Sequence, residues 1–250
     1  MIDAHYRPYG RRAKIGLIVP TTNTVNEAEW ARMAPEGVSI HVTRMVLHTG
    51  GGGGGGGDAA ALERDLAAAI ATLTPASVDV IAYGCTAGSM VSPLDRLPAR
   101  MRELGGVPAV ATSPAIVYAL RALGAKKIAL ATPYHDALNR HEIAFLAEHG
   151  ITTLSAKGLG IGGGGAHEYV NIARVPMATV LAHVRAADHP EAEAMLVSCT
   201  DFATLDLVPQ LELELGKPVV TSNLATWWQA LRTAGIHDRD ERAGRLLKAH

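Results

Sequence analysis

An internal repeat is the feature that most constrains how this 250-residue chain folds. Three segments of the first half recur in the second half in the same order, the first two at offsets of 113 and 114 positions. The matching segments are 14–20 with 127–133, 78–85 with 194–199, and 107–113 with 217–222. A repeat of this length is typical of a duplicated structural unit, so the chain is predicted to fold as two similar lobes.

Short apolar runs alternate with longer Ala- and Leu-rich stretches along both halves. The runs lack period-two alternation, which indicates parallel strands buried on both faces. The predicted strands are 15–20, 38–46, 78–84, 107–112, 127–132, 151–156, 194–198 and 218–221. The predicted helices are 24–34, 58–73, 93–104, 114–123, 135–149, 170–187, 202–215, 223–234 and 239–248.

This order predicts an α/β fold of two pseudosymmetric, doubly wound parallel-sheet lobes with the active site between them. We expect residues 1–113 to form the N-terminal lobe and residues 114–250 the C-terminal lobe. Residues 222–250 are a candidate segment to pack back on the N-terminal lobe.

The composition narrows the classes of partner and the compartment. The net charge is −1 and no basic stripe is present, so we expect no nucleic-acid partner. No apolar run reaches the length of a membrane span, and the first residues lack the apolar core of a secretory signal. With two cysteines in the chain, this favours reduced thiols in the cytoplasm, a structural disulfide being the alternative.

Two glycine tracts follow the second strand of each predicted lobe. They are residues 50–57 and 162–165, and Gly163 lies 113 positions after Gly50, the offset of the repeat. They are either flexible lids over the cleft or disordered, replaced or engineered segments, and we favour the second interpretation because all-Gly tracts are costly to order. Neither has the spacing of a phosphate-binding loop.

The two cysteines occupy equivalent places, each at the end of a buried strand. Cys85 precedes Thr86 and a predicted helix, whose N-terminus would favour the thiolate. Cys199 repeats this context, with Thr200 and Asp201 expected to open the next helix. A single buried cysteine is most often a core residue, but the equivalent placement of the only two predicts a paired-thiol active site for a small carboxylic acid.

Two facing thiols have two kinds of chemistry available. One thiol can remove a proton from a carbon while the other delivers one on the opposite side, which racemises the substrate. Alternatively, one thiolate adds to an activated double bond while the other exchanges the proton, which isomerises it.

Other polar residues lie at the strand ends. The run Thr21–Thr24 either caps a helix or offers donors to a carboxylate, and Tyr134 either donates its phenol to the substrate or is a satisfied core residue. The eleven histidines form no zinc pattern and no G-x-S-x-G elbow is present, so we expect neither a metal nor another cofactor.

Taken together, several motifs resemble those of maleate cis-trans isomerases, which belong to the aspartate/glutamate racemase superfamily with the arylmalonate decarboxylases. The motifs are residues 15–24, 34–38, 82–89, 121–130, 198–201, 205–209 and 216–223, and the resemblance runs from about Lys14 to Gly235.

This resemblance implies cofactor-independent conversion of maleate, or a close cis-unsaturated dicarboxylate, to fumarate. Cys85 would add to the alkene and Cys199 would supply and recover the proton. The implied substrate-binding residues are Thr21, Asn23, Thr86, Ala87, Tyr134, Thr200 and Asp201. Backbone N–H groups after each cysteine would help to hold the carboxylates.

One motif departs from the family pattern. The family has a ligand-binding Asn shortly before an Ile-(Gly/Ala)-Arg segment, which is Ile172 to Arg174 here. The expected position falls at Tyr169 or within the glycine tract, and Asn171 is out of register. This departure affects the identity of the substrate more than the chemistry.

The alternatives are an amino-acid or hydantoin racemase, an arylmalonate-type decarboxylase and a two-lobed binding protein. The resemblance makes the decarboxylase less favoured, because those enzymes keep only the second cysteine. We also expect a homo-oligomer, either a dimer or a tetramer.

Overall fold

The protein is described by a computed structural model that covers residues 8–46 and 59–250. Its framework is two four-stranded parallel sheets with the same strand order, β2-β1-β3-β4 and β6-β5-β7-β8. The strands are β1 (Ala13–Pro20), β2 (Val38–Met45), β3 (Val80–Tyr83), β4 (Ala109–Ala111), β5 (Lys127–Tyr134), β6 (Thr152–Ile161), β7 (Ala194–Val197) and β8 (Val219–Thr221). The eight predicted strands and the α/β fold of two similar parallel-sheet halves are confirmed.

Helices connect these strands. In the first half they are α1 (Asn26–Met33), α2 (Ala59–Leu73), η1 (Thr74–Ala76), α3 (Thr86–Ser89), α4 (Arg96–Gly105) and α5 (Thr112–Ala122). In the second half they are α6 (Asp136–Glu148), η2 (Ala166–Arg174), α7 (Met177–Ala187), η3 (Leu205–Leu207), α8 (Val208–Leu215), α9 (Ser222–Thr233), η4 (Glu241–Ala243) and α10 (Gly244–Ala249). The labels η mark 3₁₀ helices.

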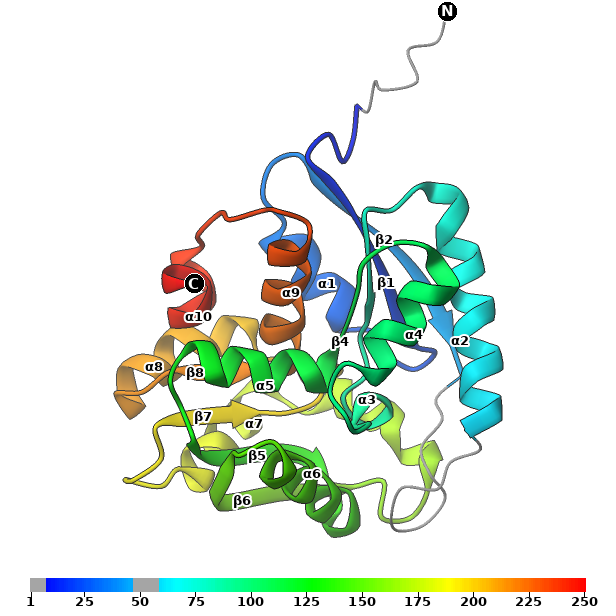
Figure 1. Ribbon diagram of the computed structural model, residues 1–250. Coiled ribbons are helices and arrows are strands. Elements are labelled where there is room, and N and C mark those ends of the chain that lie inside the picture. Colours follow the sequence, from blue (N-terminus) through cyan, green and yellow to red (C-terminus); the bar gives the residue numbers. More distant parts are fainter. Residues whose placement is uncertain (1–7, 47–58) are drawn as a thin grey trace, which may run out of the picture.

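Each sheet is covered by helices on both faces. In the first sheet, α2 and α4 pack on one face and α1 and α9 on the other (Figure 1). In the second sheet, α5 and α6 cover one face and α7 and α8 the other. Because both faces are buried, the strands consist of continuous apolar runs, as in β1, which is buried at seven of its eight positions.

Two helices are exchanged between the halves. Helix α5 follows the last strand of the first sheet, yet its buried residues pack on Ile128, Leu130 and Leu196 of the second sheet. Helix α9 follows the last strand of the second sheet and packs on β3, β4 and α1. The two exchanged helices also pack on each other. The lobe boundary between residues 113 and 114 stays a prediction.

Helices α4 and α8 end in the same way before the last strand of each sheet. Gly106 and Gly216 follow them with φ of 69° and 71°, and each N–H bonds back into the last turn. This left-handed conformation favours glycine.

Two predicted helices were wrong in detail. The predicted helix 170–187 is divided into η2 and α7, because Pro176 restricts the preceding residue and caps α7. No helix opens at Thr200: η3 begins at Leu205, and Pro209 lies in the first turn of α8, a position that tolerates its missing N–H.

The glycine tract 162–165 forms a defined turn after β6. The Glu168 carboxylate accepts hydrogen bonds from the N–H groups of Gly162, at 2.8 Å, and Gly164, at 3.2 Å. The other tract, residues 50–57, lies outside the described residues. Among the residues that the structure describes, no helix is both long and apolar enough to cross a membrane.

Candidate active site

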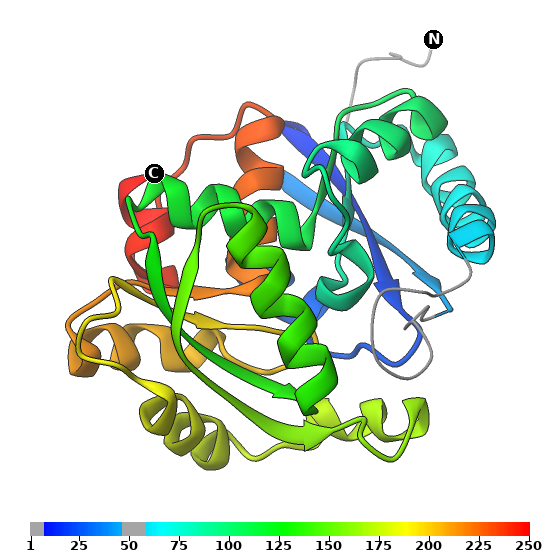
Figure 2. The same ribbon diagram turned by 60° about the horizontal axis from the view of Figure 1, so that its bottom comes forward.

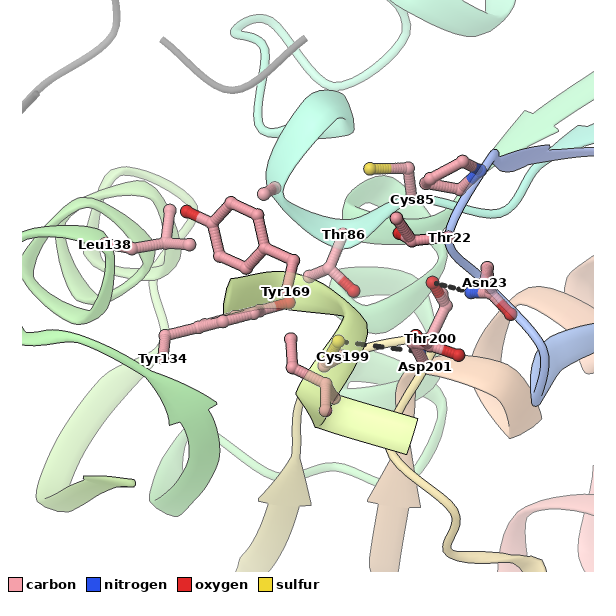
Figure 3. A pocket seen from close by; sticks show the side chains of 13 residues that line it. Thr22, Asn23, Cys85, Thr86, Tyr134, Leu138, Tyr169, Cys199, Thr200 and Asp201 are labelled. Atoms are coloured by element: carbon pink, nitrogen blue, oxygen red, sulfur yellow. Dashed lines mark hydrogen bonds between the residues drawn. The ribbon is translucent and has the colours of Figure 1, made fainter. Parts of the chain in front are cut away.

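The strands of both sheets point toward the same side of the molecule (Figure 2). A pocket lies there, at the carboxyl ends of β1, β3, β5 and β7, which is where open parallel sheets bind ligands. Both halves contribute to its lining, which consists of Pro20, Thr22, Asn23, Cys85, Thr86, Ala87, Tyr134, Leu138, Tyr169, Ile172, Cys199, Thr200 and Asp201. The structure therefore brings Cys85 and Cys199 into one pocket as free thiols (Figure 3).

Cys85 is the N-cap residue of α3. Its Sγ accepts a hydrogen bond from the Gly88 N–H at 3.3 Å. Burial nevertheless raises the pKa of the Cys85 thiol above its ordinary value, against the lowering effects of the Gly88 N–H and the Tyr83 phenol. The Gly88 N–H at the start of α3 does favour the thiolate, as expected from a helix terminus, but burial in the pocket has the larger effect on the pKa.

Cys199 lies in a backbone conformation that is unusual for a residue with a side chain. Its φ is 104°, and its N–H donates to the Ser222 hydroxyl at 2.9 Å. Strain of this kind persists where surrounding contacts hold it, and it concentrates at functional sites. The Asp201 N–H donates to Cys199 Sγ at 3.4 Å, so the turn supplies the donor expected from a helix.

A tyrosine phenol acts on each sulfur. Tyr134, at the end of β5, lowers the pKa of Cys199, as Tyr83 lowers that of Cys85. Burial has the larger effect and raises the pKa of Cys199 to about 12, although Tyr134 and the Asp201 N–H act in the opposite direction. Both thiols are therefore protonated at neutral pH. The two phenols can stabilise negative charge that develops on the sulfur atoms during a reaction.

Asn23 connects the two halves at the polar wall. Its Oδ1 caps the start of α1 by accepting from the N–H groups of Val25, at 3.1 Å, and Asn26, at 3.0 Å. Its Nδ2 donates to Thr200 Oγ1 at 3.0 Å, and that hydroxyl donates to the Gly84 carbonyl at 3.0 Å. The side-chain carbonyl of Asn23 is thus used for capping and one Nδ2 hydrogen for Thr200. The second Nδ2 hydrogen remains available to bind a ligand.

Asp201 places a carboxyl group in the lining. Its Oδ1 accepts from the Thr24 N–H at 2.8 Å, while Oδ2 is buried and bonds no described residue. Burial raises the pKa of Asp201 to about 6, against the lowering effect of the backbone N–H groups. The group lies close to its titration point at neutral pH.

The remaining sequence-predicted residues divide. Thr86, Ala87 and Thr200 line the pocket, and the Thr86 hydroxyl lies 2.9 Å from the hydroxyl of Ser222. Thr21 is exposed and does not line the pocket, where its neighbour Thr22 is found instead. Thr21 continues the pairing of β1 with β2, because its N–H donates to the Met45 carbonyl, and the chain turns toward the pocket only after it.

The opposite wall is apolar and was largely missed from the sequence. Leu138 lies there beside Tyr169, the residue noted at the departure from the family pattern (Figure 3). Ile172 adds a further apolar side chain to the lining. Asn171 faces away, where its Oδ1 accepts from Arg174 at 3.3 Å on the exposed side of η2. The available signal was the place of Leu138 on the first turns of α6, at the helix end that borders the carboxyl end of β5.

Charge in the pocket is limited to what the thiols and Asp201 carry. Among the described lining residues there is no Lys, Arg or His. Within residues 8–46 and 59–250, no three His, Cys, Asp or Glu side chains gather as a metal site.

These features define a pseudosymmetric α/β protein with one thiol from each half in a shared pocket. The sequence model of the arylmalonate decarboxylase family matches residues 15–247, and the chain belongs to this family.

Curated relatives carry two different activities. The chain is 42% identical over 141 residues to the arylmalonate decarboxylase of Bordetella bronchiseptica, a match spanning 56% of this chain and 57% of that protein. It is 30% identical over 248 residues to the maleate isomerase of Nocardia farcinica, spanning 94% and 95% of the two chains.

The fold is also similar to a solved structure of the Nocardia farcinica maleate cis-trans isomerase, with a TM-score of 0.83 between the two. That structure is of a mutant with a covalently bound succinylcysteine intermediate. It is 28% identical and covers 95% of this chain and 99% of its own. The chain is thus similar to enzymes of this family with either activity.

Proposed function

We propose that the protein is a cofactor-independent cis-trans isomerase that converts maleate, or a close cis-unsaturated acid, to its trans isomer through a thiol adduct. The observation that carries the proposal is that Cys85 and Cys199 line one pocket as free thiols, one from each half of the chain. The succinylcysteine in the similar Nocardia farcinica enzyme supports a covalent adduct.

In the proposed reaction, the thiol adds across the double bond. Cys85 Sγ forms a bond to one alkene carbon as Cys199 gives its proton to the other, and the Cys85 proton passes to the Cys199 sulfur. The former double bond is now single and rotates. In the elimination, Cys199 gives its thiol proton to the departing Cys85 sulfur and removes the proton it delivered to carbon, the C–S bond breaks, and the trans acid leaves with both thiols restored.

Neutral groups assist this reaction. As Sγ attacks, negative charge develops on the substrate carboxylate and on the Cys199 sulfur. The Tyr134 phenol, the Asp201 N–H and the free amide hydrogen of Asn23 are fixed donors in a buried pocket, where such donors act strongly. Thr86, Ala87 and Thr200 complete the polar wall.

Incubating the reduced protein with maleate and following fumarate by proton NMR tests the proposal. We expect turnover by the wild type and loss of at least 1,000-fold (~10³) in both Cys85→Ser and Cys199→Ser, since each thiol has a separate step. Intact mass of Cys199→Ser is expected to show a succinyl adduct on Cys85. Wild-type protein that binds maleate without producing fumarate contradicts the proposal.

The apolar wall supports a second candidate, decarboxylation or racemisation of an acid with an apolar substituent. Leu138, Tyr169 and Ile172 would hold that substituent, while the polar wall holds one carboxylate. In a decarboxylation, the bond to the departing CO₂ breaks and Cys199 protonates the remaining carbon. One thiol suffices for that step, whereas racemisation and isomerisation each need both.

Parallel assays separate the candidates. Phenylmalonate would yield phenylacetate and CO₂, and activity would survive in Cys85→Ser if decarboxylation is the reaction. Exchange of the α-hydrogen of 2-phenylpropionate with deuterated water, lost in either cysteine variant, would favour a racemase.

A further inference from the structure

A buried carboxyl group that the proposed reaction does not use lies behind the pocket. Glu142, on α6, is 2% exposed, and its Oε2 bonds no described residue. It lies on the buried face of α6 with Asn139, which contacts the end of β5 through Thr132 and the Tyr134 carbonyl. Buried carboxyl groups without a partner are rare, because burial without compensation is costly.

Two groups at or next to the active site interact with Glu142. One is the phenol of Tyr134, whose pKa the charge of Glu142 helps to raise. The other is Ser198, the residue before Cys199, which lowers the pKa of Glu142. The contact with Ser198 falls short of a full hydrogen bond, since neither Ser198 Oγ nor Glu142 Oε2 has a well-aligned partner among the described residues.

Among the described residues, no positive charge compensates that of Glu142. The causes that shift its pKa are burial, which raises it to about 7, and Ser198; neither Lys157 on β6 nor Arg140 and His141 on α6 contributes. Glu142 therefore changes charge near neutral pH, on the helix face that packs on the end of β5, and its charge acts on the phenol of Tyr134.

We propose that Glu142 is a positioning residue that sets the reactivity of Cys199. While its carboxyl is protonated, the Tyr134–Cys199 pair can carry the negative charge of the reaction. When the carboxyl ionises, a second negative charge in the same desolvated region opposes that state. The proposal extends the proposed function, in which Cys199 handles the proton, but it holds for any reaction that uses this thiol.

The test measures the thiol itself, so it does not depend on turnover of maleate. In a Cys85→Ser background, Cys199 is the only thiol, and its alkylation by iodoacetamide is followed by intact mass from pH 5.5 to 9.5. Alkylation reports the thiolate fraction. We expect the rise of rate with pH to slow near pH 7 as Glu142 ionises, and then to resume.

Glu142→Gln keeps the size of the side chain and removes the charge. We expect about fivefold faster alkylation than in the parent at pH 8.5, the effect of one nearby charge, and an equal rate at pH 6. Glu148→Gln, the same change on the exposed side of α6, is the matched control and should follow the parent at every pH. Ser198→Ala, which removes the group favouring the ionised carboxyl, should move the slow region to higher pH.

An unchanged or slower rate in Glu142→Gln at pH 8.5 overturns the proposal. So does a rate change of the same size at pH 6 and pH 8.5, since that would report altered access to Cys199 instead of a charge. If Glu142→Gln fails to fold, the Ser198→Ala profile decides alone, and an unmoved slow region overturns the proposal. Failure of maleate turnover leaves this readout untouched and speaks only against the proposed isomerase.

Discussion

The hydroxyl of Ser222 accepts a 2.9 Å hydrogen bond from the backbone N–H of Cys199. The same hydroxyl lies 2.9 Å from that of Thr86, which follows the other cysteine. One small side chain at the start of α9 therefore connects the two cysteine loops, although they come from different sheets. It holds Cys199 in a conformation with φ of 104° that its own side chain disfavours.

Replacing Ser222 by Ala should release this conformation. The variant leaves the buried Cys199 N–H without its acceptor, so we expect a loss of about 1–3 kcal/mol in the free energy of unfolding, measured by urea denaturation. We also expect altered alkylation of Cys199 and little change at Cys85. Thr226→Ala, which removes side-chain bonds one turn further along α9, is the control and should cost stability without changing Cys199 reactivity.

Gly88 keeps space open between the first tyrosine–cysteine pair. A Cβ at this position would collide with the Tyr83 hydroxyl and lie 3.2 Å from Cys85 Sγ. Gly88→Ala is therefore expected to displace the phenol and lower turnover about tenfold, since Tyr83 would no longer lower the pKa of Cys85. Alkylation of Cys85 in a Cys199→Ser background measures the effect directly; a rate equal to that of the parent would show that the phenol does not matter.

Tyr169 is expected to decide between a second carboxylate and an apolar group. Tyr169→Asn places an amide in the apolar wall, and we expect KM for maleate to fall about tenfold while binding of phenylmalonate weakens. Asn171→Ala, in the same helix but facing solvent, is the control. Steady-state kinetics on both acids gives the result, and a parallel loss for both would point to a collapsed wall.

The stability of the protein should depend on pH through Glu142. The pKa of this carboxyl is raised from 4.5 to about 7 in the folded protein. The folded state thus binds more protons than the unfolded state between these values, and its stability falls as pH rises through that window, by up to about 3 kcal/mol from this group. Glu142→Gln should flatten the curve, with its gain over the wild type appearing at pH 8 and not at pH 4.

Glu148→Gln serves as the control for that curve, because it makes the same change on the exposed side of α6. Asp201, whose pKa is also raised, contributes in the same direction in both proteins and cancels in the difference. A wild-type curve that rises between pH 5 and pH 7 while the Gln variant stays flat would contradict the assigned role of burial.

The strands and the two similar halves could be predicted because buried strands have recognisable apolar runs and the runs of the first half recur in the second. The apolar run of β1 and its copy in β5 fixed the strands, and the offset of the two cysteines placed both at strand ends. Long-range effects could not be predicted. The pKa of Cys199 depends on how much water the other half excludes, and Glu142 gives no local sign that it lies behind Tyr134.

The errors had local causes that only three dimensions reveal. Thr21 and Thr22 are identical in type, and the direction of the turn after β1 decides which of them reaches the pocket. The helix expected after Cys199 was an extrapolation from Cys85. The chain instead runs through an irregular turn that the Glu29 carboxylate of α1 caps by accepting from the N–H groups of Thr204, at 2.7 Å, and Leu205, at 2.8 Å.

The exchange of α5 and α9 has a consequence for the protein as a folding unit. Each sheet buries one face under a helix that belongs, in sequence, to the other half. A chain cut near Gly124 would yield two fragments. The first would keep α5 and lose α9, the second would keep α9 and lose α5, and each would expose an apolar sheet face, so neither should be soluble alone. Mixed together they are expected to complement each other, as two interlocked copies of one ancestral unit would.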